Sequence, residues 1–484
     1  MPTTKLSRKL GWHSLSLGLL SVGLSLGPAM LGVTGAIALP SGDTPSSRTT
    51  PNPAVTVERL ESVWEGEYED YLERDLDAST QTPGTIAATL RRSRVQTGRT
   101  SAVVYAMPEP YGLELRLVTE DGEVVTTMIP EADIDAIAQE VKAFRTAITN
   151  PLERQGGNNE YLIPSQQLYQ WIMAPLADAL ADAEADLVIF CMGEGLRTIP
   201  LAALHDGQQF LVEKYAIAQI PGFSLFDARH RSLKEEQVLA MGASEFQSQQ
   251  TPLPGVPIEL NTILGRKAAV SSGLDDSSKA PSADPSEDLL ALWDGTSFLN
   301  EQFTLSKLQE KHRSGNFGII HLATHAEFRP GDPKQSYIQL WSEQLTLDQL
   351  TGLDWTDPLV ELLVLSACQT AVGNAESEMG FAGLAVNSGV RSAMASLWRV
   401  SDRGTLALMG EFYRQLKQAP TRADALRETQ LALLRGAVVV EGDRITRGTR
   451  GGGIPLPQTL QTTGRESLEH PYYWAAFSMI GNPW

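Results

Sequence analysis

The chain has 484 residues, of which 42% are hydrophobic and 20% are charged. This length fits one large domain with an attachment, or two to three small domains. The formal net charge of −19 repels nucleic acid and anionic lipid, so neither is an expected partner, whereas a cationic peptide would be attracted. Two cysteines, Cys191 and Cys368, are too few for a disulfide scaffold, although an exported chain could pair them. No Cys/His cluster has zinc-ligand spacing, and we expect no metal and no cofactor.

The first 38 residues have the layout of a secretory signal peptide. A basic start is followed by an uncharged stretch rich in Leu, Ser and Gly, and Ala36-Ile37-Ala38 stands at a cleavage position. The sequence therefore predicts an exported protein, periplasmic or extracellular, whose mature chain begins near Leu39. Residues Leu15–Ala38 are also long enough for a membrane anchor, but Pro28 and the many Gly and Ser residues favour cleavage. No membrane contact beyond this possible anchor is expected.

A linker (39–54) rich in Ser, Thr and Pro and an N-terminal helical segment (55–99) are predicted next. Residues 100–150 contain three short apolar runs that are separated by Tyr111-Gly112 and Asp121-Gly122 and followed by a helix. This pattern predicts a small antiparallel meander. Its strands are expected over Ser101–Ala106, Leu113–Thr119 and Glu123–Met128.

Between residues 151 and 484, short and continuously apolar runs alternate with helical patterns. Such runs fit the strands of a mostly parallel sheet that is buried on both faces, which predicts an α/β fold. Two segments are expected outside this core: a Ser-, Asp- and Pro-rich insertion over 271–287, predicted to be disordered, and a mobile loop over 440–469. The core strands are expected over Leu187–Cys191, Val238–Met241, Phe317–Leu322, Leu362–Ser366 and Ser392–Leu397.

Two of these strands lead into residues that can do chemistry. His325 follows the run Phe317–Leu322, and Cys368 follows the run Leu362–Ser366. In open parallel sheets chemistry gathers outside the carboxyl ends of the strands, so the two side chains are expected at one edge. A thiolate there can attack a carbonyl carbon while the imidazole removes the thiol proton. By itself this pattern is weak evidence for catalysis, because a His or Cys at a strand end is more often structural. Cys191 ends another apolar strand and is interpreted as a buried small hydrophobic residue.

Six sequence blocks, which occur in the family's order, resemble the CHAT family, and in particular bacterial CHAT proteins of cyanobacterial type. The resemblance extends from about residue 100 to residue 484, which we expect to be the CHAT domain, with the meander over 100–150 and the core over 151–484. The blocks are Gly195–Gly207 (GLRTIPLAALHDG), Ile320–His325 (IHLATH), Leu365–Ala371 (LSACQTA), Gly380–Ala385 (GFAGLA), Ala395–Trp398 (ASLW) and His470–Phe477 (HPYYWAAF).

The resemblance implies a caspase-like α/β/α sandwich, related to caspases and separases, with a His–Cys dyad that hydrolyses peptide bonds. These roles map onto His325 as base and Cys368 as nucleophile, and the backbone N–H groups of Ala326 and Cys368 would stabilise the oxyanion. Many caspase-like enzymes have Gly after the catalytic His, whereas this chain has Ala326, which narrows the freedom of the backbone. His321 is interpreted as a packing or orienting residue and is the alternative base.

Asp402 is the candidate substrate-binding residue. In the related separases an Asp after a Leu-Trp strand end helps to form the pocket for a basic residue at P1, and Asp402 follows Leu397-Trp398 in a similar way. Alternatively, Ser401 or Asp402 caps the helix that follows, and Arg399 or Arg403 could neutralise the carboxylate.

The leading hypothesis is a cysteine endopeptidase of caspase-like type that acts on a protein or peptide substrate. The rival hypothesis is a catalytically weak or inactive caspase-like scaffold that mediates protein–protein interaction. Ala326 leaves room for the rival, while the intact His325 and Cys368 pair favours the enzyme. The oligomeric state is left open by the sequence.

Overall fold

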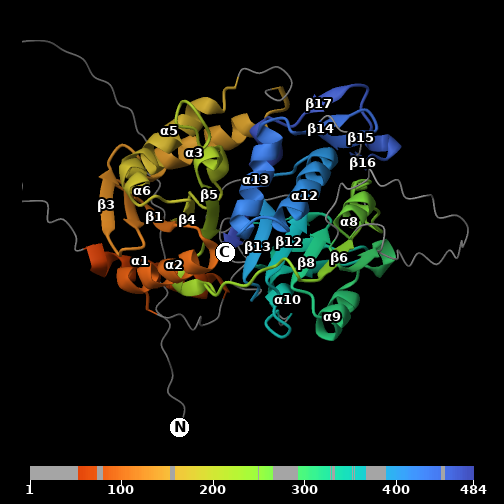
Figure 1. Ribbon diagram of the computed structural model, residues 1–484, viewed down its shortest axis with the longest axis horizontal. Coiled ribbons are helices and arrows are strands. Elements are labelled where there is room, and N and C mark those ends of the chain that lie inside the picture. The colour runs from red at the N-terminus through yellow and green to blue at the C-terminus, as the bar shows by residue number, and fades with distance from the viewer. Residues whose placement is uncertain are drawn as a thin grey trace, which may run out of the picture. The chain divides into compact units, whose positions relative to one another are not determined.

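The central sheet of the protein, as far as the chain is described, has eleven strands in the order β3-β2-β1-β4-β5-β18-β13-β12-β8-β6-β7 (Figure 1). The computed structural model describes residues 53–72, 80–152, 159–248, 250–264, 293–327, 329, 333–351, 353, 355–366, 389–448 and 453–484. The strands of this sheet are β1 (Ser101–Glu109), β2 (Gly112–Val118), β3 (Val124–Ile129), β4 (Leu187–Met192), β5 (Ala216–Ile220), β6 (Val238–Gly242), β7 (Gly295–Leu299), β8 (Ile319–Ala323), β12 (Leu362–Ser366), β13 (Ser392–Ser396) and β18 (Phe477–Gly481).

Several predicted features fall outside the described residues. These are the signal peptide (1–38), the linker up to residue 52, the insertion over 271–287, and Cys368. Within the described parts, no helix is long and apolar enough to cross a membrane.

Apart from the antiparallel edge strands β2 and β3, the sheet consists of two blocks of strands that run in opposite directions. In one block β1, β4, β5 and β18 are parallel, and in the other β13, β12, β8, β6 and β7 are parallel. The blocks meet where β13 pairs with β18 in antiparallel register, Ser396 opposite Phe477. The carboxyl ends of β8, β12 and β13 therefore lie at one edge of the sheet.

Helices cover both faces of the sheet, because its strands are apolar on both sides. Along β1, Val104 faces a cluster that includes residues of α3 (Ile134–Thr149) and α5 (Leu162–Ile172), whereas Tyr105 faces α1 (Pro53–Leu72) and α2 (Pro83–Thr97). Figure 1 shows these two pairs of helices on opposite sides of β1 and β4. The predicted α/β/α sandwich with a mostly parallel sheet is confirmed.

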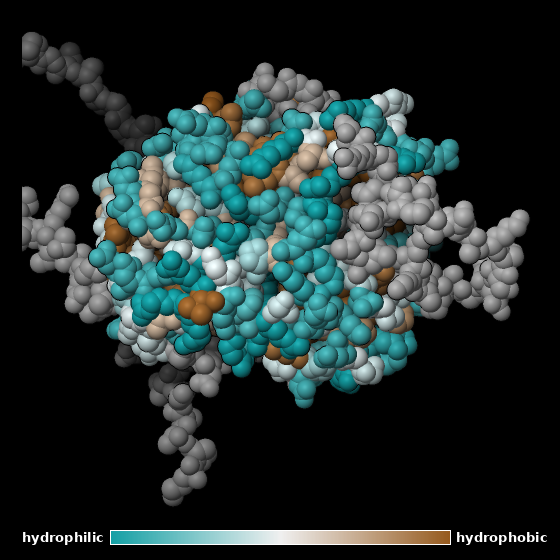
Figure 2. All heavy atoms as spheres, viewed as in Figure 1, coloured by the Kyte–Doolittle hydropathy of each residue, from teal (hydrophilic) through white to brown (hydrophobic). Residues whose placement is uncertain are grey.

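The remaining helices include the ones that carry the site. They are α6 (Ala177–Asp182), α7 (Leu211–Lys214), α8 (Val256–Leu264), α9 (Leu305–Ser314), α10 (Leu347–Thr351), α12 (Asp402–Leu416), α13 (Arg422–Leu434) and α14 (Pro471–Trp474). Figure 2 shows a face on which hydrophilic residues predominate and apolar residues occur in small groups, as expected where helices cover the sheet.

The predicted antiparallel meander is present, but it is not a separate small sheet. Strands β1, β2 and β3 pair in antiparallel fashion, with Val103 opposite Val118 and Leu113 opposite Ile129. Strand β1 also pairs in parallel with β4, Ser101 opposite Leu187. The meander is therefore the edge of the central sheet.

The segment predicted as a mobile loop over 440–469 instead contains strands. Strands β14 (Val438–Glu441), β15 (Arg444–Arg447), β16 (Gly453–Pro455) and β17 (Arg465–Ser467) form a small antiparallel sheet in the order β16-β15-β14-β17. The loop interpretation was wrong because each strand is only three or four residues long and lies between Gly, Pro and Thr residues. When residue composition is averaged over a longer window, the apolar signal of such short strands is lost.

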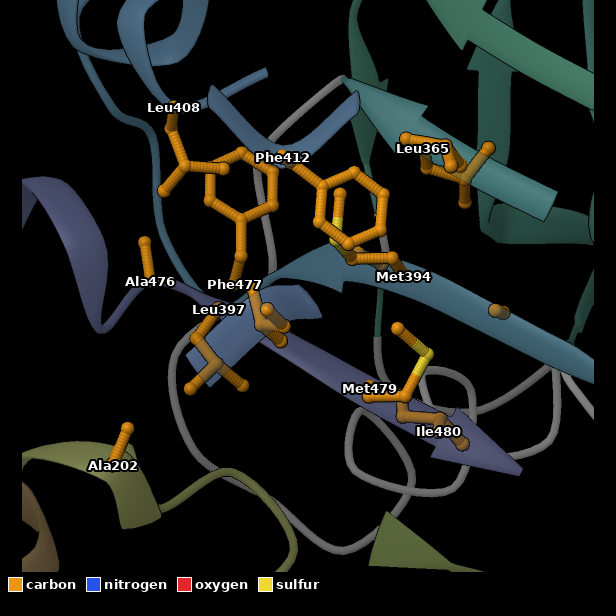
Figure 3. Close-up of a cluster of buried hydrophobic side chains, with 14 of the residues drawn as sticks. Ala202, Leu365, Met394, Leu397, Leu408, Phe412, Ala476, Phe477, Met479 and Ile480 are labelled. Atoms are coloured by element: carbon orange, nitrogen blue, oxygen red, sulfur yellow. The ribbon is translucent and has the colours of Figure 1, made fainter. Parts of the chain in front are cut away.

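Helix α12 is anchored to the centre of the sheet by apolar packing. Figure 3 shows Leu408 and Phe412 of α12 directed toward side chains of β13 and β18, among them Met394 and Met479. All four of these side chains are buried. Each buried side chain of this size contributes about 1.5–3 kcal/mol relative to exposure, so this packing holds α12 against β13 and β18.

Candidate active site

A pocket lies at the edge of the sheet where β8 and β12 end. It is open to solvent, and its hollow, open solvent included, measures about 440 Å³. His325 comes two residues after the last residue of β8, and Ser366 is the last residue of β12. The structure brings two predicted site residues, His325 and Asp402, into this one pocket. The lining residues are Leu253, Gly255, Val256, Glu259, Thr324, His325, Ser366, Arg399, Val400, Asp402 and Thr405.

The ring of His325 is held by the segment that follows β6. Its Nε2 lies 2.7 Å from the carbonyl oxygen of Thr251, and its ring centroid lies 5.0 Å from that of Phe246. A carbonyl oxygen can only accept a hydrogen bond, so Nε2 carries the proton in the neutral ring. The other nitrogen, Nδ1, is then the atom that can accept a proton.

The charge state of His325 is set mainly by burial. Burial lowers the pKa of His325, and the nearby Arg399 lowers it further, while the hydrogen bond to Thr251 and the charge of Asp402 act in the opposite direction. The net effect is a pKa below the ordinary value, which favours the neutral imidazole at neutral pH. A neutral imidazole is the form that a general base requires.

Asp402 is not the cap of its helix. The cap of α12 is Ser401, whose hydroxyl accepts a hydrogen bond from the N–H of Gly404 at 3.2 Å. Asp402 is the first residue of the helix, and its Oδ2 accepts a long hydrogen bond of 3.4 Å from the N–H of Gly255. Burial, followed by the charge of Glu259, raises the pKa of Asp402. Because Ser401 does the capping, the carboxylate of Asp402 is available to the pocket.

The two arginines beside Asp402 have different roles. Arg399 lines the pocket and lowers the pKa of both Asp402 and His325. Arg403 instead forms an ion pair with Glu466 at 2.9 Å. Among the described residues that line the pocket, Arg399 is therefore the cation.

The loop that leads from β13 to α12 is held by main-chain hydrogen bonds from distant elements. The guanidinium of Arg145, on α3, donates to the carbonyl oxygen of Leu397 at 3.1 Å. The hydroxyl of Tyr472 donates to the carbonyl oxygen of Arg399 at 2.8 Å, and the indole N–H of Trp398 donates back to the carbonyl of Tyr472 at 3.0 Å. These bonds fix the wall on which Arg399 and Asp402 stand.

His321 lies in the core below this pocket. It is fully buried in β8 and is not among the lining residues. Its Nδ1 is 3.1 Å from the hydroxyl of Tyr413, and its Nε2 is 3.0 Å from Oε1 of Glu259. This position fits the predicted packing or orienting role better than that of an alternative base.

The structure does not place the other predicted site residues, Ala326 and Cys368, among those that line the pocket. Ala326 is buried and begins β9 (Ala326–Glu327), opposite Ile338 of β10 (Tyr337–Gln339), and it is not among the pocket-lining residues. Cys368 lies outside the described residues, but β12 delivers the chain to the pocket at Ser366, two residues earlier. The dyad and the oxyanion donors remain predictions.

Cys191 is buried in β4, as the sequence predicted. It packs with Tyr105, and burial, aided by the charge of Glu61, raises the pKa of the Cys191 thiol well above its usual range. Such a thiol is a poor nucleophile.

In the described part of the chain, no group of three or more His, Cys, Asp or Glu side chains is arranged to hold a metal.

Among the contributors to the pocket that sequence reasoning missed, two show why it missed them. One is the carbonyl of Thr251, which no side-chain motif can indicate. The other is Glu259, which is part of an otherwise apolar helical pattern with Val256, Leu260 and Ile263. A carboxylate on the buried stripe of α8 was the available signal, because an acidic residue there is rarely buried without a partner.

Comparisons with known proteins place the chain in a family. No curated protein sequence is significantly similar to it. Two crystal structures of the Saccharomyces cerevisiae separase–securin complex are similar to this chain. One has 8% sequence identity to it and a TM-score of 0.43, and the match covers 84% of this chain and 32% of the solved chain. The other has 9% identity and a TM-score of 0.45, and the match covers 82% of this chain and 31% of the solved chain. A complex of the pro- and mature domains of Porphyromonas gingivalis RgpB has 10% sequence identity to this chain and a TM-score of 0.35. The match covers 79% of this chain and 78% of the RgpB chain. The family model of the CHAT domain matches residues 162–482. The chain belongs to the CHAT family.

Proposed function

We propose that the protein is a cysteine endopeptidase in which Cys368 is the nucleophile and His325 is the general base. The main support is the position of His325 in a pocket at the carboxyl ends of β8 and β12, with Nε2 bound to the Thr251 carbonyl. This bond leaves Nδ1 as the proton acceptor. A lowered pKa keeps the imidazole neutral and ready to act as base.

The proposed reaction has two steps. First, Nδ1 of His325 takes the thiol proton, and the Cys368 sulfur attacks the scissile carbonyl carbon to give a tetrahedral oxyanion. The oxyanion collapses, the C–N bond breaks, and the imidazolium gives its proton to the leaving amine. Water then attacks the thioester while His325 takes its proton, which releases the acid product and restores the thiol. The N–H groups of Ala326 and Cys368 are the proposed oxyanion donors.

Asp402 is the proposed recognition group for a basic P1 side chain. Its carboxylate lines the pocket, and from the described residues it accepts one long hydrogen bond, from a main-chain N–H. A carboxylate has two oxygens, so it retains the capacity to accept bonds from a cationic substrate. The net charge of −19 raises the encounter rate with cationic substrates but does not provide this local contact.

A peptide library profiled with wild type and variants tests the proposal. Cys368→Ala should abolish cleavage, and His325→Ala should nearly do so, because nucleophile and base act as a unit. Cys191→Ala is the matched control and should cleave normally, since this thiol is buried in β4. Asp402→Asn should lose basic P1 substrates and spare neutral ones.

Two outcomes would reject this function. Cleavage that survives Cys368→Ala would mean that the nucleophile is misassigned. A wild type that cleaves nothing, even after limited proteolysis to release a latent form, would favour the alternative, a CHAT scaffold that mediates protein–protein interaction.

A further inference from the structure

The loop that holds the ring of His325 connects β6 to α8 and covers residues 243–255. Phe246 lies against the imidazole, with the two ring centroids 5.0 Å apart, and the carbonyl oxygen of Thr251 is 2.7 Å from Nε2. Residue 249 of this loop lies outside the described residues. Because the Thr251 carbonyl keeps the proton on Nε2, the position of this loop determines which nitrogen of His325 is free to act as a base.

Two main-chain hydrogen bonds shape this loop. The N–H of Leu253 donates to the carbonyl oxygen of Ser244 at 2.9 Å, which brings the two ends of the loop together. The N–H of Gln247 donates to the carbonyl oxygen of Trp341, in the turn after β10, at 3.2 Å. Ser244 is therefore the residue at which the loop closes on itself.

The side chain of Asn300, directly after β7, holds Ser244 in place. Its Oδ1 accepts hydrogen bonds from the N–H of Ser244 at 2.8 Å, from the hydroxyl of Ser244 at 3.2 Å and from the N–H of Glu245 at 3.3 Å. An amide oxygen has two lone pairs and is the side-chain atom that can serve these donors. Since Ser244 is also bonded to Leu253, Asn300 holds both ends of the loop from a neighbouring strand.

The backbone of Asn300 restricts which residues can do this. Its φ of 51° lies in the left-handed region, and its carbonyl oxygen accepts a hydrogen bond of 2.7 Å from the N–H of Phe303, which closes the turn. Glycine adopts this conformation most readily, whereas asparagine and aspartate are the residues with a side-chain oxygen that tolerate it well. An asparagine here satisfies the turn and also supplies the acceptor that the loop uses.

We propose that Asn300 is a positioning residue for His325, because it holds the loop so that the Thr251 carbonyl stays at Nε2. The inference rests on the proposed function, in which Nδ1 of His325 accepts the proton of the Cys368 thiol. If the loop moved away, Nε2 would lose its acceptor and the proton could shift to Nδ1. An imidazole protonated at Nδ1 cannot accept the thiol proton there. Asn300 therefore selects the active tautomer of the base.

Nitrogen NMR of protein labelled at histidine tests the tautomer without catalysis, with His325→Gln used to assign the signal. At a pH where the ring is neutral, wild type should show the proton of His325 on Nε2. Asn300→Gly, which suits the left-handed backbone but removes Oδ1, should show a mixture with the Nδ1–H tautomer. Asn300→Asp keeps an acceptor and should resemble wild type. Asn159→Gly, at an exposed asparagine with a φ of 52°, is the matched control and should change nothing.

Kinetics with a peptide substrate separate positioning from binding. Asn300→Gly should lower kcat about tenfold or more with little change in KM, because a misplaced base slows the reaction while the substrate contacts remain. Asn300→Asp should recover the wild-type kcat. A rise in KM at unchanged kcat would instead place Asn300 in substrate binding and overturn the inference.

Ser244→Ala is the milder variant if Asn300→Gly fails to fold, since it removes one of the three bonds to Oδ1. It should show the Nδ1–H tautomer at a lower population, and a spectrum identical to that of wild type would then overturn the inference. A tautomer shift in Asn300→Gly, with a wild type that cleaves nothing, would reject the proposed function and leave the inference standing. Cleavage by wild type, with a tautomer and a kcat indifferent to Asn300→Gly, would reject the inference alone.

Discussion

The carboxylate of Glu361 is the centre of a buried charge network at the start of β12. Its Oε1 is 2.8 Å from Nη1 of Arg391, and its Oε2 is 3.3 Å from Nη2 of Arg422. The side chains are 0%, 8% and 1% exposed, respectively. Burial lowers the pKa of Arg422 to about 10, an effect that Glu361 opposes. The network lies at the opposite end of β12 from the pocket.

Replacement of this carboxylate should be strongly destabilising. Glu361→Gln keeps the shape but removes the carboxylate that pairs with the buried guanidinium of Arg422 and leaves Arg391 paired with Asp227 alone. Breaking a buried ion pair in this way costs about 3–5 kcal/mol. Urea denaturation should show this loss as a lower midpoint with an unchanged slope. Glu310→Gln, which breaks the exposed pair with Lys307 at 2.6 Å, is the matched control and should not move the midpoint.

A double-mutant cycle decides whether the network acts as a unit. Arg391→Met alone should also destabilise, because it removes a cation that neutralises Glu361 and Asp227. The double variant Glu361→Gln with Arg391→Met should lose less than the sum of the two single variants. A loss below about 1 kcal/mol for Glu361→Gln, or simple additivity, would refute the reasoning, since either would mean that Glu361 is not the partner that these cations need.

Three further predictions concern the thiols, the base and the N-terminus. Iodoacetamide should modify Cys368 much faster than Cys191, whose pKa is raised by burial; faster labelling of Cys191, or a disulfide between the two, would contradict both assignments. Arg399 contributes to the lowered pKa of His325, so Arg399→Gln should raise that pKa. With a neutral P1 substrate, the acid limb of the pH profile of kcat/KM should then move to higher pH. A shift to lower pH would exclude His325 as the base. We also propose that the signal is cleaved, so mass spectrometry should place the mature N-terminus near Leu39, whereas an intact N-terminus would count against cleavage.

The strands that the sequence predicted correctly are those with a continuous apolar run. Strands β4, β6, β8 and β12 are buried along their whole length, so every position favours apolar residues. Strand β7, with the sequence Gly-Thr-Ser-Phe-Leu, was missed because it lies at the edge of the sheet and only part of it is buried. The small sheet β14–β17 was missed for a related reason, since its strands are too short to set a period.

The site was predicted in part for the same physical reason. His325 stands out because an apolar strand delivers it to the end of the sheet, and Asp402 stands out because it follows another strand end. Thr251 contributes a main-chain carbonyl, which is common to all residues and leaves no trace in the sequence. Glu259 requires knowledge of which strand its helix covers before its contact with His321 becomes visible.

Three of the six family blocks are brought together at the wall of the pocket. Arg145 joins the carbonyl of Thr198, in the first block, to the carbonyl of Leu397, in the fifth. Tyr472, in the last block, binds the carbonyl of Arg399, directly after the fifth. Helices beside the block of strands that contains β1, β4, β5 and β18 therefore hold the loop that carries the acidic side of the pocket. The family match begins at residue 162, after α3 and its Arg145, so the structural unit that positions this site begins earlier than the match does.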